Sequence, residues 1–365
     1  LAFVPIWGVM ALLPLYKKNR TQMNTEPVLS LSKDKHSFFS SSVPSVVNLL
    51  KFLSAGLASI VVVWAVFGFE WGPFLFQTGG LAGLNAVSGP MPTFWAGIEK
   101  IVLLSGGGRG AYLLGEYSTA GFLAYFPIAF VVKTPLVTLV GLVITAVLLI
   151  KQPRTRKRAL FVLTVPLLYF ELSMVSRLNI GYRHLLPVLP FVYLLAAGLV
   201  DWSTEPKRQR QARVGLVGWL VGLLVAVMWI HPHYLSFFNV AAGGPANGHT
   251  ILLDSNIDWG QDLFRLQDWM ADQGVEKVKL GWFGTAVPSY YHLNYEPLPG
   301  FPYPEFISQW GSPPFDVTAP EPGIYAISVS NLMELPLPHS GVYAWFRTRE
   351  PDTRIGYSIW IYRVE

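Results

Sequence analysis

Residues 207–230 read KRQRQARVGLVGWLVGLLVAVMWI, a basic cluster followed directly by an uninterrupted apolar run. The apolar part, 214–230, is long enough to cross about 30 Å of hydrocarbon as a helix, which needs roughly 17–25 residues. Basic residues gather in cytoplasmic loops, so the cluster at 207–213 places the start of this helix on the cytoplasmic side. Residues 231–365 are therefore expected on the extracytoplasmic side.

Five further apolar runs have the length, or nearly the length, of a membrane span: about 1–16, 50–69, 133–150, 159–176 and 185–200. Basic clusters follow the first run at 17–35, the third at 151–158 and the fifth at 207–213. Because these clusters fall in alternate loops, all three predict the same orientation. The loops 70–132 and 177–184 then lie outside. The sequence predicts a polytopic α-helical membrane protein, with about six helices over 1–230 and an extracytoplasmic domain over 231–365.

The charge balance differs between these two parts. Residues 1–230 contain 20 Lys and Arg against 8 Asp and Glu, whereas 231–365 contain 7 against 14. A basic membrane part fits contact with lipid phosphates, and an acidic tail argues against nucleic acid as a partner. The chain has no cysteine, which excludes disulfides and cysteine-ligated metal sites. It begins inside an apolar run, without Met or a cleavage site, so we expect the natural N-terminus upstream of Leu1.

The outer loop 70–132 contains glycine breaks and one apolar stretch, 94–104. This stretch predicts a helix lying in the membrane interface. An ordinary packed loop explains the same residues equally well, and both interpretations stay open.

The tail alternates short apolar runs with one amphipathic segment. We expect strands at 250–254, 278–282, 324–329 and 359–364, and a helical turn at 343–348. A helix over 259–273 is expected to begin at an Asp258 N-cap with Gln261 as the partner of a capping box, and to bury Leu263, Leu266 and Met270. Strand–helix–strand order favours a small α/β sheet with parallel pairs.

Polar residues follow the predicted strands: Asp254 and Asn256 after the first, Thr285 after the second, Asn331 after the third. Ligands of such sheets bind beyond the carboxyl ends of the strands, which predicts a polar crevice. Helix caps and turns use the same residue types, and such a structural role is the more common explanation for these residues. The spacing of Asp254, Asn256 and Asp258 resembles the start of a calcium loop, but Trp259 and Arg265 stand where that loop needs Gly and Glu. A looser divalent-cation site is the only cofactor that remains possible.

Three cations, Lys133, Arg177 and Arg183, are expected at one depth on the outer face, and His184 is adjacent to Arg183. Positive charge is uncommon on this side of a membrane. A phosphate at the membrane surface explains the group, because Arg binds phosphate with a bidentate fork and Lys with a point charge. Contact of long side chains with lipid headgroups is the alternative.

Several motifs from residue 105 onward resemble those of bacterial family 39 glycosyltransferases, which are similar to protein O-mannosyltransferases. They are YLLGEYS at 112–118, YFP at 125–127, KTP at 133–135, NIGYRHLLP at 179–187, GGP at 243–245, DSNIDWGQD at 254–262, FGT at 283–285 and RIGY at 354–357. Residues 1–104 match only in hydropathy.

This resemblance implies a GT-C architecture in a bacterial inner membrane, with an active site at the outer face. It implies a polyprenyl-phosphate-linked sugar as donor and a hydroxyl on a protein, lipid or polysaccharide as acceptor. The donor phosphate would contact Lys133, Arg177, Arg183 and His184. The sugar or the acceptor would contact Glu116, Asn179, Asp254, Asn256 and Asp258. The family's general base lies in an earlier outer loop, so no catalytic residue is assigned in this chain, and we expect the chain by itself to be inactive.

Two other classes of function compete with this one. In the first, the spans only anchor a tail that binds a glycan or a partner protein without catalysis. In the second, the protein is a transporter, but its hydropathy shows no inverted repeat and no broken helix with charges at the membrane midplane. A glycosyltransferase is the preferred interpretation.

Overall fold

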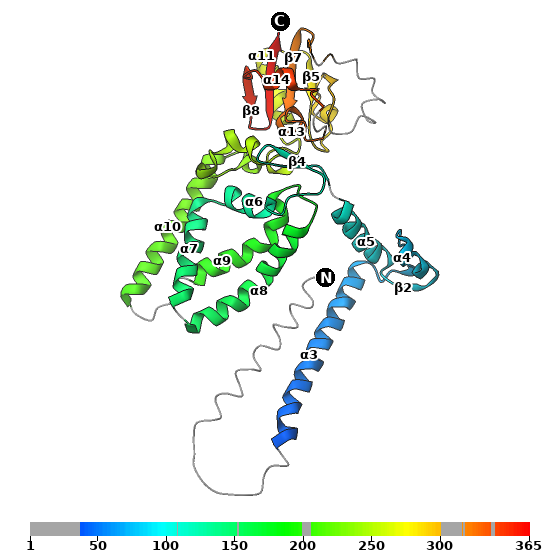
Figure 1. Ribbon diagram of the computed structural model, residues 1–365, viewed down its shortest axis with the longest axis vertical. Helices are drawn as coiled ribbons and strands as arrows, with labels where there is room; N and C mark the ends of the chain where they lie inside the picture. Colours follow the sequence, from blue (N-terminus) through cyan, green and yellow to red (C-terminus); the bar gives the residue numbers. More distant parts are fainter. Residues whose placement is uncertain are drawn as a thin grey trace. The chain divides into compact units, whose positions relative to one another are not determined.

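The computed structural model describes residues 37–107, 109–151, 153–198, 206–300, 316, 318–336 and 340–365 (Figure 1). The chain divides into two compact units between Leu104 and Ser105. The boundary that we predicted at 230/231 falls inside the second unit. The predicted first span, 1–16, lies outside the described residues.

In the first unit, a long helix is followed by a small folded loop. Helix α3 (Ser37–Val66) precedes a hairpin in which β1 (Trp71–Pro73) pairs antiparallel with β2 (Ser88–Pro90). The short helices α4 (Gly79–Ala82) and η1 (Gly83–Ala86) lie between these strands.

Helix α5 (Pro92–Gly107) follows and confirms the helix predicted over 94–104. The buried Glu99 carboxylate accepts hydrogen bonds from the amides of Gln77 (2.7 Å) and Thr78 (2.8 Å), and these bonds hold the loop against α5. The apolar side chains of Ile101 and Val102 are exposed, and a position in the membrane interface remains a prediction for this helix.

Four helices of the second unit overlap the predicted spans at 133–150, 159–176, 185–200 and 214–230: α7 (Leu136–Lys151), α8 (Pro153–Val175), α9 (Leu189–Gly198) and α10 (Pro206–Ile230). Two further segments were not predicted: α6 (Tyr125–Lys133) lies mostly in the predicted outer loop 70–132, and η2 (Tyr182–Val188) begins in the predicted loop 177–184. Helix α7 packs against α8, α9 and α10 (Figure 1). Where α7 meets α10, a Cβ atom on Gly222 would lie 2.9 Å from Val137 Cγ2. The glycine therefore permits the close approach of the two helices.

The chain bends by 110° between α6 and α7. Pro135 explains the break, because a residue before proline avoids helical geometry, and Thr134 is extended (φ −93°, ψ 135°). Asn239 satisfies the carbonyl groups that the break frees. Its side-chain amide donates to the oxygens of Val131 (2.6 Å) and Thr134 (2.9 Å), and its backbone N–H donates to Val132 (2.9 Å).

Among the described residues, one straight helix is long and apolar enough to cross a bilayer, 209–230 within α10. The bent pair of α6 and the first part of α7 passes the same test only when the two helices are taken together. The apolar parts of α3 and α8, 53–66 and 162–175, are shorter than a full span. Membrane insertion therefore remains a prediction for all of these helices, α10 included.

The tail contains a five-stranded mixed sheet in the order β6-β5-β7-β9-β8. Strand β5 (Val278–Gly281) pairs in parallel with β6 (Tyr295–Pro297) and β7 (Gly323–Ser328), as expected. Strand β9 (Ile359–Val364) pairs antiparallel with both β7 and β8 (Thr353–Ile355). The short helix α14 (Ala344–Arg347) confirms the predicted helical turn. A separate hairpin, β3 (Ala111–Leu113) with β4 (Glu116–Ser118), precedes α6.

Helix α11 (Leu263–Gln273) covers the sheet and buries Leu263, Leu266 and Met270, which confirms the predicted apolar stripe. Its start was predicted wrongly. Asp262, not Asp258, directly precedes the helix, and no side chain caps it. The capping box does not form because Gln261 instead accepts from the Trp259 amide (2.8 Å) and donates to the Ile257 carbonyl (2.9 Å).

The strand predicted at 250–254 was also wrong. This stretch joins two short 3-10 helices, η5 (Pro245–Thr250) and η6 (Asp254–Asn256). Asp254 has a left-handed backbone conformation (φ 61°), which a strand cannot accommodate. The apolar Leu252 and Leu253 are fully buried all the same, so hydrophobicity here reports burial and not strand geometry.

Candidate functional site

The turn η6 packs against residues 180–182, where η2 begins. The Asn256 side chain accepts a hydrogen bond from the Tyr182 amide (2.9 Å) and donates to the Tyr125 hydroxyl (2.9 Å) and the Leu253 carbonyl (2.7 Å). The Ser255 hydroxyl donates to the Ile180 carbonyl (2.5 Å). Asn256 is completely buried, and its side chain joins the tail to the helices. This arrangement favours a structural role over the ligand contact that the resemblance implied.

Lys133, the last residue of α6, has its ammonium group inside the protein. The Nζ atom donates to the carbonyl oxygens of Leu235 (2.7 Å) and Asn256 (2.6 Å) and lies 4.4 Å from the centre of the Phe238 ring. An ammonium has three protons, and two of them are used by these carbonyls. Lys133 therefore stabilises the junction, and its Nζ atom has at most one proton left for a ligand.

A groove of about 370 Å³ opens beside Lys133. Its lining includes Ala226, Val227 and Ile230 from the end of α10, and the polar side chains that line it are Lys133, Tyr182, Arg183, Tyr234 and Ser255. The apolar lining residues are Pro135, Leu186, Ala226, Val227, Ile230, Leu235 and Phe237. The groove thus combines apolar side chains with cationic and hydroxyl-bearing ones.

Arg183 is the exposed cation of this groove. Its guanidinium lies 5.3 Å from the centre of the Trp259 ring, a cation–π distance. Within the described part of the chain, it forms no ion pair and donates no hydrogen bond. Its five N–H donors are available to an anion in the groove.

Asp254 lies one residue from Ser255, which lines the groove. Its Oδ1 atom accepts a hydrogen bond from the Ser255 amide (2.5 Å), and only 8% of the side chain is exposed. Burial raises the pKa of Asp254 to about 6, against the opposing pull of Arg109 and Arg183. A buried carboxylate beside two arginines, in a left-handed conformation, is a combination that often marks a functional site.

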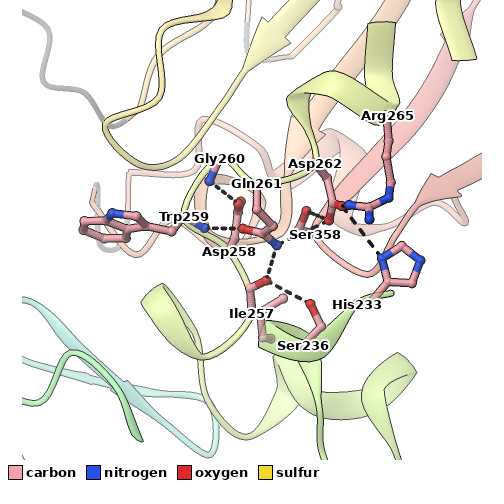
Figure 2. Close-up of polar contacts among 10 residues, drawn as sticks. All are labelled: His233, Ser236, Ile257, Asp258, Trp259, Gly260, Gln261, Asp262, Arg265 and Ser358. Carbon is pink, nitrogen blue, oxygen red and sulfur yellow. Dashed lines mark hydrogen bonds and ion pairs between the residues drawn. The ribbon is translucent and has the colours of Figure 1, made fainter. Parts of the chain in front are cut away.

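The next two aspartates of the motif belong to a network inside the tail (Figure 2). Asp258 accepts hydrogen bonds from the Gly260 amide (2.9 Å) and from the hydroxyl of Ser328 at the end of β7. Asp262 accepts from Arg265 (2.5 Å) and Ser358 (2.5 Å), and its Oδ1 atom lies 3.8 Å from Nδ1 of His233 (Figure 2). Both carboxylates are about 1% exposed. These contacts favour a role for Asp258 in holding the loop to the sheet rather than in binding sugar.

Replacing Asp258 by asparagine is expected to flatten the pH dependence of stability. Burial raises the pKa of Asp258 to about 7, so the folded protein keeps a proton that the unfolded chain loses near pH 4. Stability should therefore fall as the pH rises from about 4 to 7, and the Asp258→Asn protein should lack this part of the loss. The amide retains an acceptor for Gly260 and gains a donor for Ser328.

The measurement is the melting temperature of both proteins between pH 4.5 and 8. Burial also raises the pKa of Asp254, to about 6, but this residue is present in both proteins and its effect cancels in the difference. Asp268→Asn, on the exposed face of α11, is the matched control. Parallel curves for wild type and Asp258→Asn would contradict the assignment.

The other predicted contacts do not converge on the groove. Asn179 is buried, accepts from the Phe122 amide (2.5 Å) and donates to the Ser176 carbonyl (3.2 Å), so it braces the turn after α8. Arg177 and Glu116 are exposed, and neither lines the groove. Burial and the neighbouring Arg183 lower the pKa of His184, which leaves its imidazole neutral at pH 7. Of the four predicted phosphate ligands, Lys133 and Arg183 are brought together.

Two tyrosines and a serine belong to the site, although they were not predicted from the sequence to contact a ligand. Tyr182 lines the groove, and its hydroxyl lies 3.0 Å from the Thr134 hydroxyl. Tyr125 lies beneath Asn256, and Ser255 forms part of the wall. All three stand inside quoted motifs, and Tyr182 and Ser255 are each next to a residue that was selected; the preference for charged side chains explains why they were missed.

Among the described residues, no group of three or more His, Asp or Glu side chains is placed to hold a metal ion. The loose divalent-cation site considered for Asp254, Asn256 and Asp258 receives no support, because the latter two side chains are occupied by protein donors. Comparison of the chain with protein-family models, with curated proteins and with solved structures finds no match.

Proposed function

We propose that this protein is an integral-membrane glycosyltransferase that moves a sugar from a polyprenyl phosphate to an acceptor hydroxyl at the outer membrane face. The observation that carries the proposal is the groove, whose lining combines one guanidinium, Arg183, with apolar side chains from the end of α10. A polyprenyl phosphate has the same two-part chemistry, an anionic head on an isoprenoid chain.

The surroundings of the groove support a lipid ligand. Helix α10 exposes apolar side chains along its length, including Val214, Val217, Leu220 and Leu224, each more than half exposed. Such a helix fits contact with hydrocarbon, where it needs no polar face. An isoprenoid chain that entered along this helix would reach the groove without leaving an apolar environment. Each buried methylene would contribute about 0.8 kcal/mol.

Arg183 accounts for the step in which the lipid phosphate leaves the sugar. During transfer, the bond between the sugar C1 atom and the phosphate oxygen breaks, and C1 bonds to the acceptor oxygen. The leaving phosphate gains negative charge, and a guanidinium fork stabilises that charge. The acceptor proton must pass to a base. The groove accounts for donor binding and departure only.

The proposal is tested by filling the groove. Ala226→Trp would place an indole on the apolar wall of α10 and exclude the first part of the isoprenoid chain. Losing contact with about two methylenes weakens binding roughly tenfold, and steric exclusion adds to this. Binding of radiolabelled undecaprenyl phosphate to the 365-residue chain in phosphatidylcholine nanodiscs is the measurement.

Leu224→Trp is the matched control, because Leu224 is on the same helix and is exposed outside the groove. It should bind the lipid as the wild type does. Equal binding by Ala226→Trp and wild type would remove the groove from the proposal. No binding by a folded wild-type protein would favour the alternative of a membrane-anchored glycan- or partner-binding protein.

A further inference from the structure

We propose that the loop between α3 and α5 inserts its apolar side chains among the acyl chains of the membrane, and that the first unit binds a lipid surface in this way. The loop consists of residues 71–90 and contains the hairpin of β1 and β2 with the short helices α4 and η1 (Figure 1). The inference goes beyond the proposed function, because it depends on a membrane location and not on a reaction.

The loop has no charge of its own. Glu70 is the only charged residue between Lys51 and Glu99, so residues 71–98 contain no Asp, Glu, Lys or Arg. In an average soluble domain, about 25% of the residues are charged, and most of them lie on the surface. A folded loop of this length without a charged residue is therefore unlike the surface of a soluble protein.

Polar groups of the loop are paired within the first unit. The Asn85 side chain accepts a hydrogen bond from the Phe76 amide (2.9 Å) and donates one to the Phe76 carbonyl (2.9 Å). Thr78 donates to the Glu99 carboxylate from its amide (2.8 Å) and from its hydroxyl. Polar groups without a partner are costly in hydrocarbon, so these bonds prepare the loop for an apolar environment.

The large side chains that the loop leaves exposed are apolar. Leu75, Leu81, Leu84 and Val87 are each between 42 and 53% exposed. Exposed apolar surface marks a site for a protein or a membrane. Protein interfaces have a polar rim and are enriched in Arg, whereas residues 71–98 contain no charged side chain at all. This composition favours lipid as the partner.

The loop also continues directly from an apolar helix. Within α3, Leu53–Val66 is an apolar stretch, and its last residue is 79% exposed. Aromatic rings gather where this stretch ends: the ring centre of Trp64 lies 5.4 Å from that of Phe69 and 5.9 Å from that of Trp71. Tryptophan concentrates at the boundary between hydrocarbon and headgroups. A loop that begins at this boundary can reach the acyl chains with its leucines, at a depth of roughly 5–10 Å.

The experiment uses the absence of cysteine from the chain, since a single introduced thiol then carries the only label. Leu84→Cys is labelled with bimane in the 365-residue chain and placed in phosphatidylcholine nanodiscs. Asp268→Cys, on the exposed face of α11, is the matched control. Two quenchers are compared: a lipid with a nitroxide near the top of its acyl chain, and iodide in the water.

The label at Leu84 should lose more fluorescence to the nitroxide lipid than to iodide, and the label at Asp268 should show the reverse. A larger loss to iodide at Leu84 would overturn the inference, because the loop would then lie in water. Protection from both quenchers would overturn it as well, in favour of a protein contact.

A second substitution tests whether the apolar side chains are the cause. Leu81→Asp, added to the labelled Leu84→Cys protein, places a carboxylate where hydrocarbon would make it costly. Leu81 is exposed, so the melting temperature should not change, while quenching should shift from the nitroxide lipid to iodide. Unchanged lipid quenching in the folded variant would contradict the inference. Ligand binding in the groove is measured separately, so either proposal can fail alone.

Discussion

Replacing Arg183 by alanine is expected to weaken binding of undecaprenyl phosphate by roughly 10- to 100-fold, the largest effect on ligand binding that we predict. Among the described residues, Arg183 forms no ion pair and donates no hydrogen bond, and its guanidinium lies over the ring of Trp259. A hydrogen bond to a charged group contributes about 1.5–3 kcal/mol, and that range sets the size of the loss. Arg183→Lys should retain part of the affinity, because it keeps the charge and loses the fork.

The measurement is lipid binding in nanodiscs at two salt concentrations. Arg210→Ala, on α10 at the opposite end from the groove, is the control for removing one arginine. Added salt should reduce wild-type binding more than binding by Arg183→Ala, since the variant lacks the charge that salt screens. A full loss in Arg177→Ala, together with wild-type binding in Arg183→Ala, would move the phosphate site to the other arginine of the turn.

Replacing Asn256 by alanine is expected to destabilise the second unit by about 3–5 kcal/mol. The substitution removes three hydrogen bonds from a completely buried side chain and leaves the Tyr182 amide, the Tyr125 hydroxyl and the Leu253 carbonyl without their partner. Each unsatisfied buried group costs about 1–3 kcal/mol. The melting temperature should fall by roughly 10 °C.

Thermal unfolding of the purified chain, followed by tryptophan fluorescence, measures this effect. Asn294→Ala is the matched control, because Asn294 is exposed and only its backbone oxygen bonds within the tail. The control should unfold at the wild-type temperature. A shift below about 2 °C for Asn256→Ala would show that the junction does not depend on this side chain.

The strands and the amphipathic helix of the tail could be predicted because their signals are local. Val278 and Leu280 alternate with polar neighbours, and Leu263, Leu266 and Met270 repeat with a helical period. Each pattern records which side of an element faces the core, and the core is where the structure places them. The start of α11 could not be predicted in this way. Asp258 resembled an N-cap, but Ser328, 70 residues away, uses its carboxylate.

The contacts of the charged residues in the candidate site could not be predicted from the sequence either. Hydropathy placed Lys133 and Arg183 at one depth, and the groove contains both. Their different roles depend on distant partners: Lys133 donates to carbonyls 102 and 123 residues further along the chain. No residue near Lys133 in the sequence indicates that these carbonyl groups are its partners. Arg183 has no such partner among the residues that the structure describes, and this too is decided by the tertiary fold.

The bend between α6 and α7 has a consequence for the order in which the protein is made. Its carbonyl groups are satisfied by Asn239, which the ribosome adds 108 residues after Val131. At about 5–20 residues synthesised per second, Asn239 is added roughly 5–20 s after Val131. The two helices therefore emerge early, but the corner between them is completed only when the beginning of the tail has been synthesised. The groove lies beside this bend. It can therefore assemble only late in biogenesis, after the beginning of the tail has been synthesised.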